Sequence, residues 1–251
     1  MVLRYIDQGP RDARTVFFLH PLGADLHLWD AVSTGLAATH RVIRYDLRGH
    51  AGSEVGSGPI TMDDHVSDLV ALLDRLGVRD ATLAGVSVGG LIAQAAALAH
   101  PKRFRRLVLC ATGARIGSVE SWSERIRVVT ESGFDAVAAT SPSRWFAPGF
   151  VDREPATARG WQSVLRCQPV RGYVGTCGVL RDTDLRSTVG QVRVPTLVVT
   201  GEHDPVTPPA LGRELAALIP GAEFVLIRNA AHLPPLEQPA ELIALLTRFL
   251  A

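Results

Sequence analysis

Short apolar runs rich in β-branched residues alternate with helical patterns along most of the chain. Each run is mostly apolar at consecutive positions, whereas a strand with one solvent-exposed face alternates apolar and polar residues. Strands that are buried on both faces and separated by helices are typical of a mainly parallel sheet flanked by helices. The pattern therefore predicts the α/β class. The runs are Thr15–Leu19, Arg41–Asp46, Ala81–Gly85, Arg106–Cys110, Thr196–Gly201 and Glu223–Ile227.

Further elements complete this pattern. Val2–Asp7 alternates apolar and polar residues, which predicts an edge strand. A helix is predicted over Thr61–Leu76, where the first residue can cap the amino end and apolar residues line one face. The segment after Ser87 is apolar nearly all round, which predicts a helix buried against the sheet. A last helix is predicted near Glu237–Leu250.

The stretch from about residue 114 to 189 departs from this alternation of strands and helices. It has no clear strand, and it contains three of the four tryptophans together with several Pro and Gly residues. A small helical cap inserted into the sheet domain accounts for these features. Residues 1–113 and 190–251 are then predicted to form an α/β core, with residues 114–189 as the cap of the same domain. Because α/β proteins bind ligands at the carboxyl ends of their strands, the cap is expected to lie over the site.

The composition narrows the class of protein. A chain of 251 residues suffices for one large domain, and 47% hydrophobic and 20% charged residues are usual for a globular protein. A net charge of +1 without a Lys- or Arg-rich run argues against nucleic-acid binding. The amino-terminal residues lack the apolar stretch of a signal peptide, and no segment suits a membrane span. The sequence does not indicate an oligomeric state.

The cysteines and histidines point to a reduced, metal-free protein. Three cysteines without a secretion signal are expected to be free thiols, which favours a cytoplasmic location. Cys110 ends an apolar strand and is expected to be buried. Neither residue type has the spacing of metal ligands, so no metal is predicted.

A nucleophile is predicted at Ser87, in the motif Gly85-Val86-Ser87-Val88-Gly89. The G-x-S-x-G pattern alone is weak, and it also fits a structural turn. Here the motif follows a predicted strand and opens a predicted helix, as a nucleophile elbow does. Its glycines lack the Cβ atoms that would collide with neighbouring backbone in so sharp a turn. A dinucleotide-binding glycine motif would need glycine at position 87.

The serine hydroxyl needs a neighbouring base. Among eight histidines, His232 has the expected position, in the loop after the last predicted strand. His203 is the rival, but it adjoins the candidate acid in the sequence. The remaining histidines on predicted helices or at their ends are expected at the surface; these are His27, His40, His65 and His100.

The acid is predicted at Asp204, in the loop after the strand Thr196–Gly201. Its carboxylate would fix the tautomer of His232 and stabilise the imidazolium. Glu202 is the alternative acid, and it also fits a structural role. The loop after Cys110, the other common place for the acid, offers no carboxylate.

The oxyanion of an acyl-transfer reaction needs backbone N–H donors. One is predicted at Val88, directly after the nucleophile and at the start of a helix. The second is expected from the loop His20-Pro21-Leu22-Gly23, and Leu22 is the candidate because the preceding proline has no N–H. His20 is expected to brace this loop.

With these residues the chain resembles the α/β-hydrolase superfamily over its whole length. It is most similar to the bacterial 3-oxoadipate enol-lactonases. That similarity rests on Trp122-Ser123-Glu124-Arg125, Arg144-Trp145-Phe146, the stretch from Tyr173 through Leu180-Arg181-Asp182, and Asn229-Ala230-Ala231-His232. The match departs at Pro21, Val88 and Gly178-Val179, none of which is a triad position.

The resemblance implies a cofactor-free hydrolase that opens a small carboxylated enol-lactone through an acyl-enzyme. A substrate carboxylate favours an arginine partner, for which Arg125 and Arg144 are candidates, and Trp122 and Trp145 are candidate walls. Cap tryptophans also commonly pack the core of the cap, and exposed arginines are common. The same triad would serve a carbon–carbon bond hydrolase or an esterase or perhydrolase, and a non-catalytic ligand receptor is the alternative outside enzymes.

Overall fold

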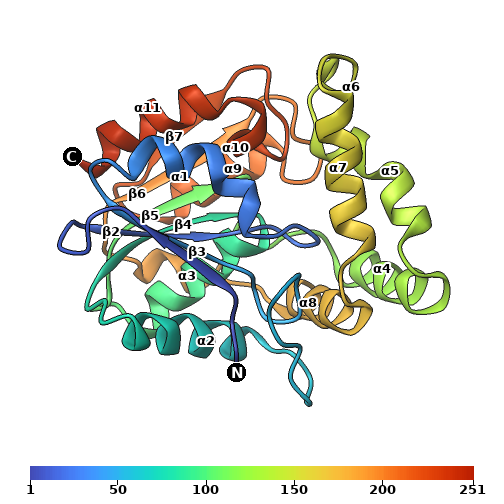
Figure 1. Cartoon of the computed structure of the whole chain (residues 1–251), viewed down its shortest axis with the longest axis horizontal. Helices are drawn as coiled ribbons and strands as arrows, with labels where there is room; N and C mark the ends of the chain where they lie inside the picture. Colours follow the sequence, from blue (N-terminus) through green and yellow to red (C-terminus); the bar gives the residue numbers. More distant parts are fainter.

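Seven strands form a single sheet in the computed structural model, which describes residues 1–251. Their order across the sheet is β1-β3-β2-β4-β5-β6-β7 (Figure 1). β1 pairs antiparallel with β3 at one edge, and every other neighbouring pair is parallel. The predicted α/β class is confirmed, and the predicted strands differ from the observed ones only at their ends. The strands are β1 (Tyr5–Gln8), β2 (Thr15–Leu19), β3 (Arg41–Tyr45), β4 (Ala81–Val86), β5 (Phe104–Cys110), β6 (Thr196–Gly201) and β7 (Glu223–Ile227).

Alternate residues of the inner strands point into two separate cores. Phe17 and Leu19 of β2 belong to one cluster of buried apolar side chains, whereas Val16 and Phe18 belong to the other. Successive side chains of a strand point to opposite faces, so two apolar cores require apolar residues at consecutive positions. This requirement explains the unbroken apolar runs in the sequence.

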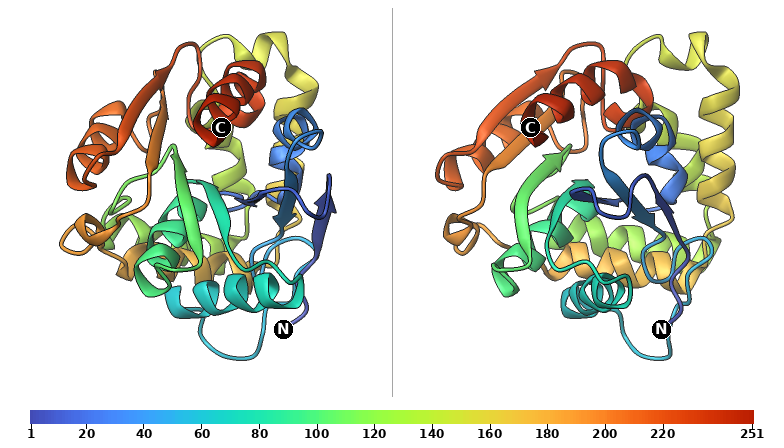
Figure 2. Two further views of the ribbon diagram at one scale, coloured as in Figure 1. Left: turned by 90° about the vertical axis from the view of Figure 1, so that its left-hand side faces the viewer. Right: turned by 60° about the vertical axis from the view of Figure 1, so that its left-hand side comes forward.

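Helices cover both faces of the sheet (Figures 1 and 2). Buried residues of α2, α3 and α9 belong to the first core, and those of η1, α1 and α11 belong to the second. The helix predicted over Thr61–Leu76 is α2, and its first turn is closed by a capping box between Thr61 and Asp64. The bounds are η1 (Leu26–Trp29), α1 (Asp30–Leu36), α2 (Met62–Arg75), α3 (Val88–Ala99), α9 (Pro209–Leu218) and α11 (Pro239–Leu250), with a short 3-10 helix η2 (Val189–Gln191) before β6.

The last predicted helix, near Glu237–Leu250, is α11, which begins two residues later than predicted, at Pro239. A single turn, α10 (Pro234–Glu237), precedes α11, and Gln238 between them leaves the helical conformation with φ −138° and ψ 56°. Pro239 is the cause, because its ring disfavours a helical conformation in the residue before it. The proline then serves as the first residue of α11, where a missing N–H costs nothing.

The helices between β5 and β6 lie together at one end of the molecule (Figure 1). This α4–α8 segment has a small apolar core of its own. It approaches the rest of the fold closely at α8, where a Cβ on Gly172 would lie 1.9 Å from the carbonyl oxygen of Gly49. Only glycine permits that approach. The bounds are α4 (Val119–Ser132), α5 (Asp135–Trp145), α6 (Phe150–Arg153), α7 (Pro155–Arg166) and α8 (Val170–Asp182).

Membrane crossing by a helix has no support in the structure. None of the helices combines the length and the apolar character that a bilayer span needs.

Three histidines other than His232 are buried in the interior. The prediction that His65 lies at the surface is wrong, because it shares the inward face of α2 with Leu69 and Leu72, one and two turns later. The rings of His20 and His50 meet edge to face with centroids 5.2 Å apart. Burial lowers the pKa of His20 to about 4 and those of His50 and His65 to about 3.

We expect the free energy of unfolding to fall as the pH drops from about 6.5 toward 4. His20, His50 and His65 stay neutral in the folded protein over this range, whereas the unfolded chain protonates them near pH 6.5. The unfolded state therefore binds more protons, and each histidine contributes a slope of about 1.4 kcal/mol per pH unit. Denaturant unfolding as a function of pH measures the slope. In a His65→Leu variant the slope should be smaller by about 1.4 kcal/mol per pH unit, which corresponds to one proton. An unchanged slope would show that the His65 ring protonates in the folded state.

Candidate active site

The predicted catalytic residues all follow strands at the carboxyl edge of the sheet. Ser87 follows β4, Asp204 follows β6 and His232 follows β7. These strands are parallel, so their carboxyl ends meet at one edge, where α/β proteins bind ligands. Ser87 and His232 line the same pocket there, and Asp204 contacts His232. The fold thus gathers three side chains that are distant in the sequence.

Ser87 occupies a strained turn between β4 and α3. Its backbone has φ 56° and ψ −119°, a conformation that residues other than glycine rarely adopt. Gly85 and Gly89 permit the turn. A Cβ on Gly85 would lie 2.3 Å from the carbonyl carbon of Gly89, and a Cβ on Gly89 would lie 2.5 Å from the carbonyl oxygen of Leu19. Backbone strain of this kind is concentrated at functional sites.

His232 and Asp204 form a buried pair. Nδ1 of His232 lies 2.9 Å from Oδ2 of Asp204, and their side chains are only 4% and 0% exposed. The carboxylate also accepts hydrogen bonds from the N–H groups of Val206 and Thr207 and from the Thr207 hydroxyl, at 2.8, 2.9 and 2.7 Å. Because the carboxylate accepts, Nδ1 of His232 is the donor, and in the neutral ring Nε2 is free to accept a proton.

The charge of Asp204 suits this role. Burial opposes the ionised form, but His232 and the donors of Thr207 outweigh it and hold the pKa of the Asp204 carboxyl below its usual value. An acid that stays ionised beside the imidazole stabilises the imidazolium when the ring takes a proton.

The alternative base and acid lie outside the pocket. His203 and Glu202 are exposed and face each other, with 3.6 Å between Nε2 and Oε2. The Glu202 carboxylate also accepts a hydrogen bond from the N–H of Asn229 at 3.3 Å. Neither residue lines the pocket that contains Ser87. The geometry favours Asp204 and His232 as partners of the serine.

Two backbone N–H groups near Ser87 donate to no atom of the protein. Val88 is the first residue of α3, and Leu22 lies in the loop after β2. Leu22 lines the pocket together with Ser87. The first N–H groups of a helix lack intrahelical acceptors, and the helix dipole favours negative charge near them. Both donors suit an oxyanion.

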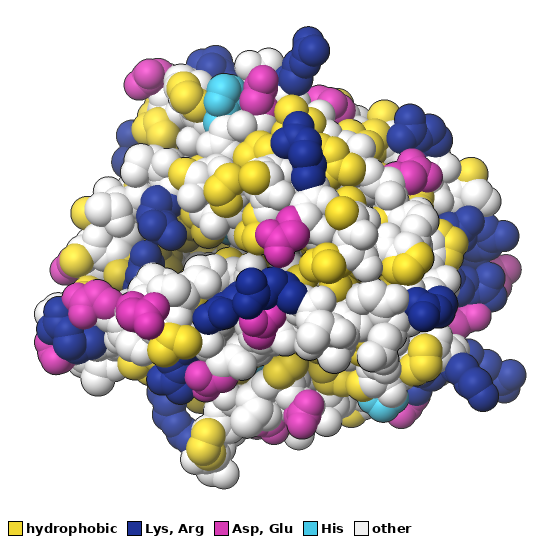
Figure 3. Space-filling model, turned by 180° about the vertical axis from the view of Figure 1, so that it is seen from behind, with side chains coloured by type: hydrophobic (Ala, Val, Ile, Leu, Met, Phe, Trp, Pro, Cys, Tyr) yellow, Lys and Arg dark blue, Asp and Glu magenta, His cyan; other side chains and the backbone are white.

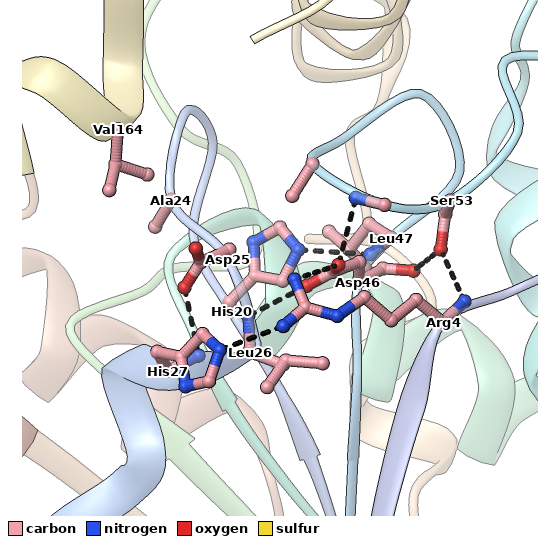
Figure 4. A network of polar contacts seen from close by, with 12 residues as sticks. Arg4, His20, Ala24, Asp25, Leu26, His27, Asp46, Leu47, Ser53 and Val164 are labelled. Atoms are coloured by element: carbon pink, nitrogen blue, oxygen red, sulfur yellow. Dashed lines mark hydrogen bonds and ion pairs between the residues drawn. The ribbon is translucent and has the colours of Figure 1, made fainter. Parts of the chain in front are cut away.

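The loop of Leu22 is braced by His20. The Nδ1–H group donates to the carbonyl of Pro21 at 2.8 Å. Nε2 accepts a hydrogen bond from the N–H of Leu47 at 2.9 Å (Figure 4). Both ring nitrogens are therefore occupied, and burial keeps the ring neutral. His20 supports the loop rather than taking part in proton transfer.

Asp46 extends this support to the loop after β3 (Figure 4). Oδ1 accepts a hydrogen bond from the N–H of Leu26 at 2.9 Å, and Oδ2 accepts from the N–H of Gly52 at 3.0 Å. The guanidinium of Arg4 lies 3.4 Å from Oδ2. One buried carboxylate thus connects the residue before β1, the start of η1 and the loop that follows β3.

The α4–α8 segment supplies much of the pocket wall. All four residues predicted to meet the substrate, Trp122, Arg125, Arg144 and Trp145, line the pocket. The space-filling view shows a hollow near the end of the molecule that carries α4 to α8, bordered by Lys or Arg side chains (Figure 3). The complete lining is Pro21, Leu22, Ser87, Trp122, Arg125, Val137, Ser141, Arg144, Trp145, Tyr173, Val206 and His232.

The two arginines of the pocket have no carboxylate partner. Arg125 donates to the hydroxyl of Tyr173 at 3.3 Å. Arg144 keeps part of its side chain in solvent, and partial burial together with the charge of Arg125 lowers the pKa of its guanidinium. Guanidinium groups nevertheless remain protonated in proteins. Two uncompensated cations favour an anionic ligand in this pocket.

Sequence reasoning missed several lining residues. Val137 and Ser141 precede Arg144 and Trp145 by helical intervals of seven and four, so all four share one face of α5. That periodicity was a usable signal. Thr207 completes the partners of Asp204 from three residues further along the same loop, a spacing at which a hydroxyl reaches back to a carboxylate.

Comparison with known proteins agrees with this geometry. The model of the family described as the alpha/beta hydrolase fold matches residues 14–239. The 3-oxoadipate enol-lactonase 2 of Acinetobacter baylyi is 34% identical over 239 residues, which are 95% of this chain and 89% of the relative. The crystal structure of the enol-lactonase from Burkholderia xenovorans LB400 aligns with a TM-score of 0.96 at 36% identity, covering 99% of this chain and 96% of that one. A malate-bound thermophilic esterase from Thermogutta terrifontis aligns with a TM-score of 0.93 at 30% identity, covering 99% and 92%.

Proposed function

Because this chain belongs to the α/β-hydrolase fold family, we propose that Ser87, His232 and Asp204 form the catalytic triad of a hydrolase that opens a small carboxylated enol-lactone. The resemblance to enol-lactonases drawn from the sequence is confirmed, and the chain is a carboxylic-ester hydrolase. The observation that carries the proposal is the pocket shared by a strained serine and a histidine that donates to a buried carboxylate.

The reaction begins with attack on the lactone carbonyl. Oγ of Ser87 bonds to the carbonyl carbon while Nε2 of His232 takes its proton, and Asp204 stabilises the imidazolium. The negative oxygen of the tetrahedral intermediate accepts hydrogen bonds from the N–H groups of Leu22 and Val88. The ring C–O bond then breaks, and the imidazolium of His232 gives its proton to the leaving ring oxygen, which departs as an enol and leaves His232 neutral again.

The second half releases the product. The enol formed on ring opening tautomerises to a ketone, so the leaving oxygen is not regenerated and the reverse reaction is disfavoured. Water then gives a proton to His232 and attacks the acyl-enzyme through the same tetrahedral geometry. The acid is set free as 3-oxoadipate, and Ser87 recovers its proton.

Recognition of the substrate falls to the α4–α8 segment, which acts as a cap over the strand ends. An acetate arm of the lactone is bound by the guanidinium of Arg144 or Arg125, whose planar forks match a carboxylate. Trp122 and Trp145 form flat apolar walls for a small ring. The absence of a carboxylate partner for either arginine supports an anionic substrate.

A carboxylated acyclic ester is the second candidate substrate. The malate-bound esterase shares the fold at 30% identity, and the same two arginines would serve any small ester that carries a carboxylate. One assay separates the candidates. Purified protein is offered freshly generated 3-oxoadipate enol-lactone, an acyclic ester that carries a carboxylate such as monomethyl succinate, p-nitrophenyl acetate and a ring-cleaved dienoate, and the largest kcat/KM is expected for the lactone. A larger kcat/KM for any of the other substrates would overturn the lactonase assignment.

Removal of the Arg144 side chain is expected to raise KM for carboxylated substrates but not for neutral ones. Loss of a charge-assisted hydrogen bond in Arg144→Ala should raise KM for a carboxylated substrate about 10- to 100-fold, with little change for a neutral ester. Arg125→Ala tests the other candidate in the same way. Arg127→Ala is the matched control, because this arginine lies on α4 outside the pocket and pairs with Glu124 and Glu131. Equal effects on both kinds of substrate would remove the role of Arg144.

A further inference from the structure

We infer that Glu237 is a positioning residue, which holds the loop of His232 in place and fastens it to the pocket wall. Glu237 ends α10, directly after this loop, and its side chain points into the protein with the residue only 8% exposed. The inference rests on the proposed role of His232 as the base, and it assigns a task to a carboxylate that does not touch the substrate.

One oxygen of Glu237 fixes both neighbours of the base. Oε2 accepts hydrogen bonds from the N–H of Ala231 at 2.8 Å and from the N–H of Leu233 at 3.3 Å. These residues flank His232 in the chain, so the peptide groups on either side of the imidazole are held by a single buried atom. The direction of the His232 side chain depends on that backbone.

The other oxygen reaches the α4–α8 segment. Oε1 accepts a hydrogen bond from the N–H of Ala147 at 2.6 Å. Two residues earlier, the carbonyl of Trp145 accepts the N–H of His232 itself at 3.1 Å. The base and a wall of the pocket therefore belong to one hydrogen-bonded unit. A substrate that contacts the wall is placed relative to the base by the same carboxylate.

The donor count determines the charge of Glu237. Three N–H groups point at its two oxygens, and a proton on either oxygen would face a donor instead of an acceptor. The buried site therefore holds the ionised form, although burial raises the pKa of this carboxyl above its usual value. A fixed negative charge then lies near the triad, where it adds to that of Asp204. The positive charge of Arg144 faces the same region.

The test compares Glu237→Gln with Glu202→Gln. Glutamine has one acceptor oxygen, so the variant cannot serve both the His232 loop and Ala147. Glu202 is the matched control, since this exposed carboxylate accepts a single N–H from the same loop. With the lactone, or whichever substrate proves best, Glu237→Gln is expected to lower kcat about tenfold or more while KM changes less. The control variant should retain the wild-type values.

The pH profile separates positioning from stability. Loss of a negative charge near the imidazole favours its neutral form, so the acidic limb of the kcat/KM profile should move to lower pH in Glu237→Gln. The position of this limb does not depend on the folded fraction. A variant that loses only thermal stability, with the limb unmoved and kcat per folded molecule unchanged, would overturn the inference.

A second substitution keeps the inference testable if Glu237→Gln does not fold. Glu237→Asp retains the charge but shortens the reach, so kcat should fall while the acidic limb stays at its wild-type pH. Wild-type kcat in that variant would contradict the positioning role. Failure of the proposed function is a distinct result, because Ser87→Ala tests the triad without changing any contact of Glu237.

Discussion

Replacement of Ser87 by alanine is expected to lower kcat about a million-fold on every ester or lactone that the enzyme hydrolyses. Without Oγ no acyl-enzyme forms, and His232 has no hydroxyl to deprotonate. The N–H groups of Leu22 and Val88 remain, but they have no attached intermediate to stabilise. Assays at high enzyme concentration, with product detected over hours, measure the residual rate.

The loss of activity should leave folding and binding intact. Alanine and serine strain the backbone similarly at φ 56°, and the glycines that permit the turn are unchanged. Thermal unfolding and calorimetric titration with the carboxylate product should therefore give values close to those of the wild type. Ser123→Ala, on the exposed side of α4, is the control that keeps full activity. Turnover that survives in Ser87→Ala would eliminate the serine mechanism.

Replacement of Asp204 by asparagine is expected to lower kcat about ten thousand-fold. The amide keeps the volume of the carboxylate, but its NH2 group can donate to Nδ1 of His232. That hydrogen bond selects the tautomer with the proton on Nε2, which cannot act as a base toward Ser87. Steady-state kinetics at neutral pH measure the change.

The same experiment decides between the two acids considered from the sequence. Glu202 is exposed and lies outside the pocket, so Glu202→Gln should retain activity where Asp204→Asn does not. The reverse outcome, a large loss in Glu202→Gln with Asp204→Asn active, would reassign the acid.

Much of the fold follows from local patterns. The strands are visible because a sheet with a core on each face needs consecutive apolar residues, as in Val16–Leu19. The turn at Ser87 is visible because Gly85 and Gly89 leave room for backbone that a Cβ would strike. Chain order then singles out Asp204 and His232, because parallel strands bring their following loops to one edge.

The remaining features depend on contacts between elements that are far apart in the sequence. A polar residue on a helix is expected at the surface unless the surface that packs against it is known. For this reason the sequence predicts His65 at the surface, whereas the fold buries it. Glutamate usually lies at the surface, so the sequence does not single out Glu237. Only the folded chain shows that its carboxylate accepts hydrogen bonds from the N–H groups of Ala147, Ala231 and Leu233. Pro239 is a local signal that the last helix begins two residues later than the predicted Glu237.

The chemistry and the specificity lie on different parts of the chain. The loops after β4, β6 and β7 supply the proposed triad, which would serve any ester, whereas Trp122, Arg125, Arg144 and Trp145 come from the α4–α8 segment. Substitutions in the segment should therefore change which substrate is preferred, and substitutions in the loops should change the rate for all of them.

Mass spectrometry of the enzyme quenched during turnover of 3-oxoadipate enol-lactone tests the central claim most directly. Opening of the ring on the serine retains every atom of the substrate, so the account predicts an added mass of one whole lactone on the peptide that contains Ser87. The adduct should be absent from Ser87→Ala and should disappear as the substrate is consumed. Rapid turnover with an adduct on another residue, and none on Ser87, would contradict the account.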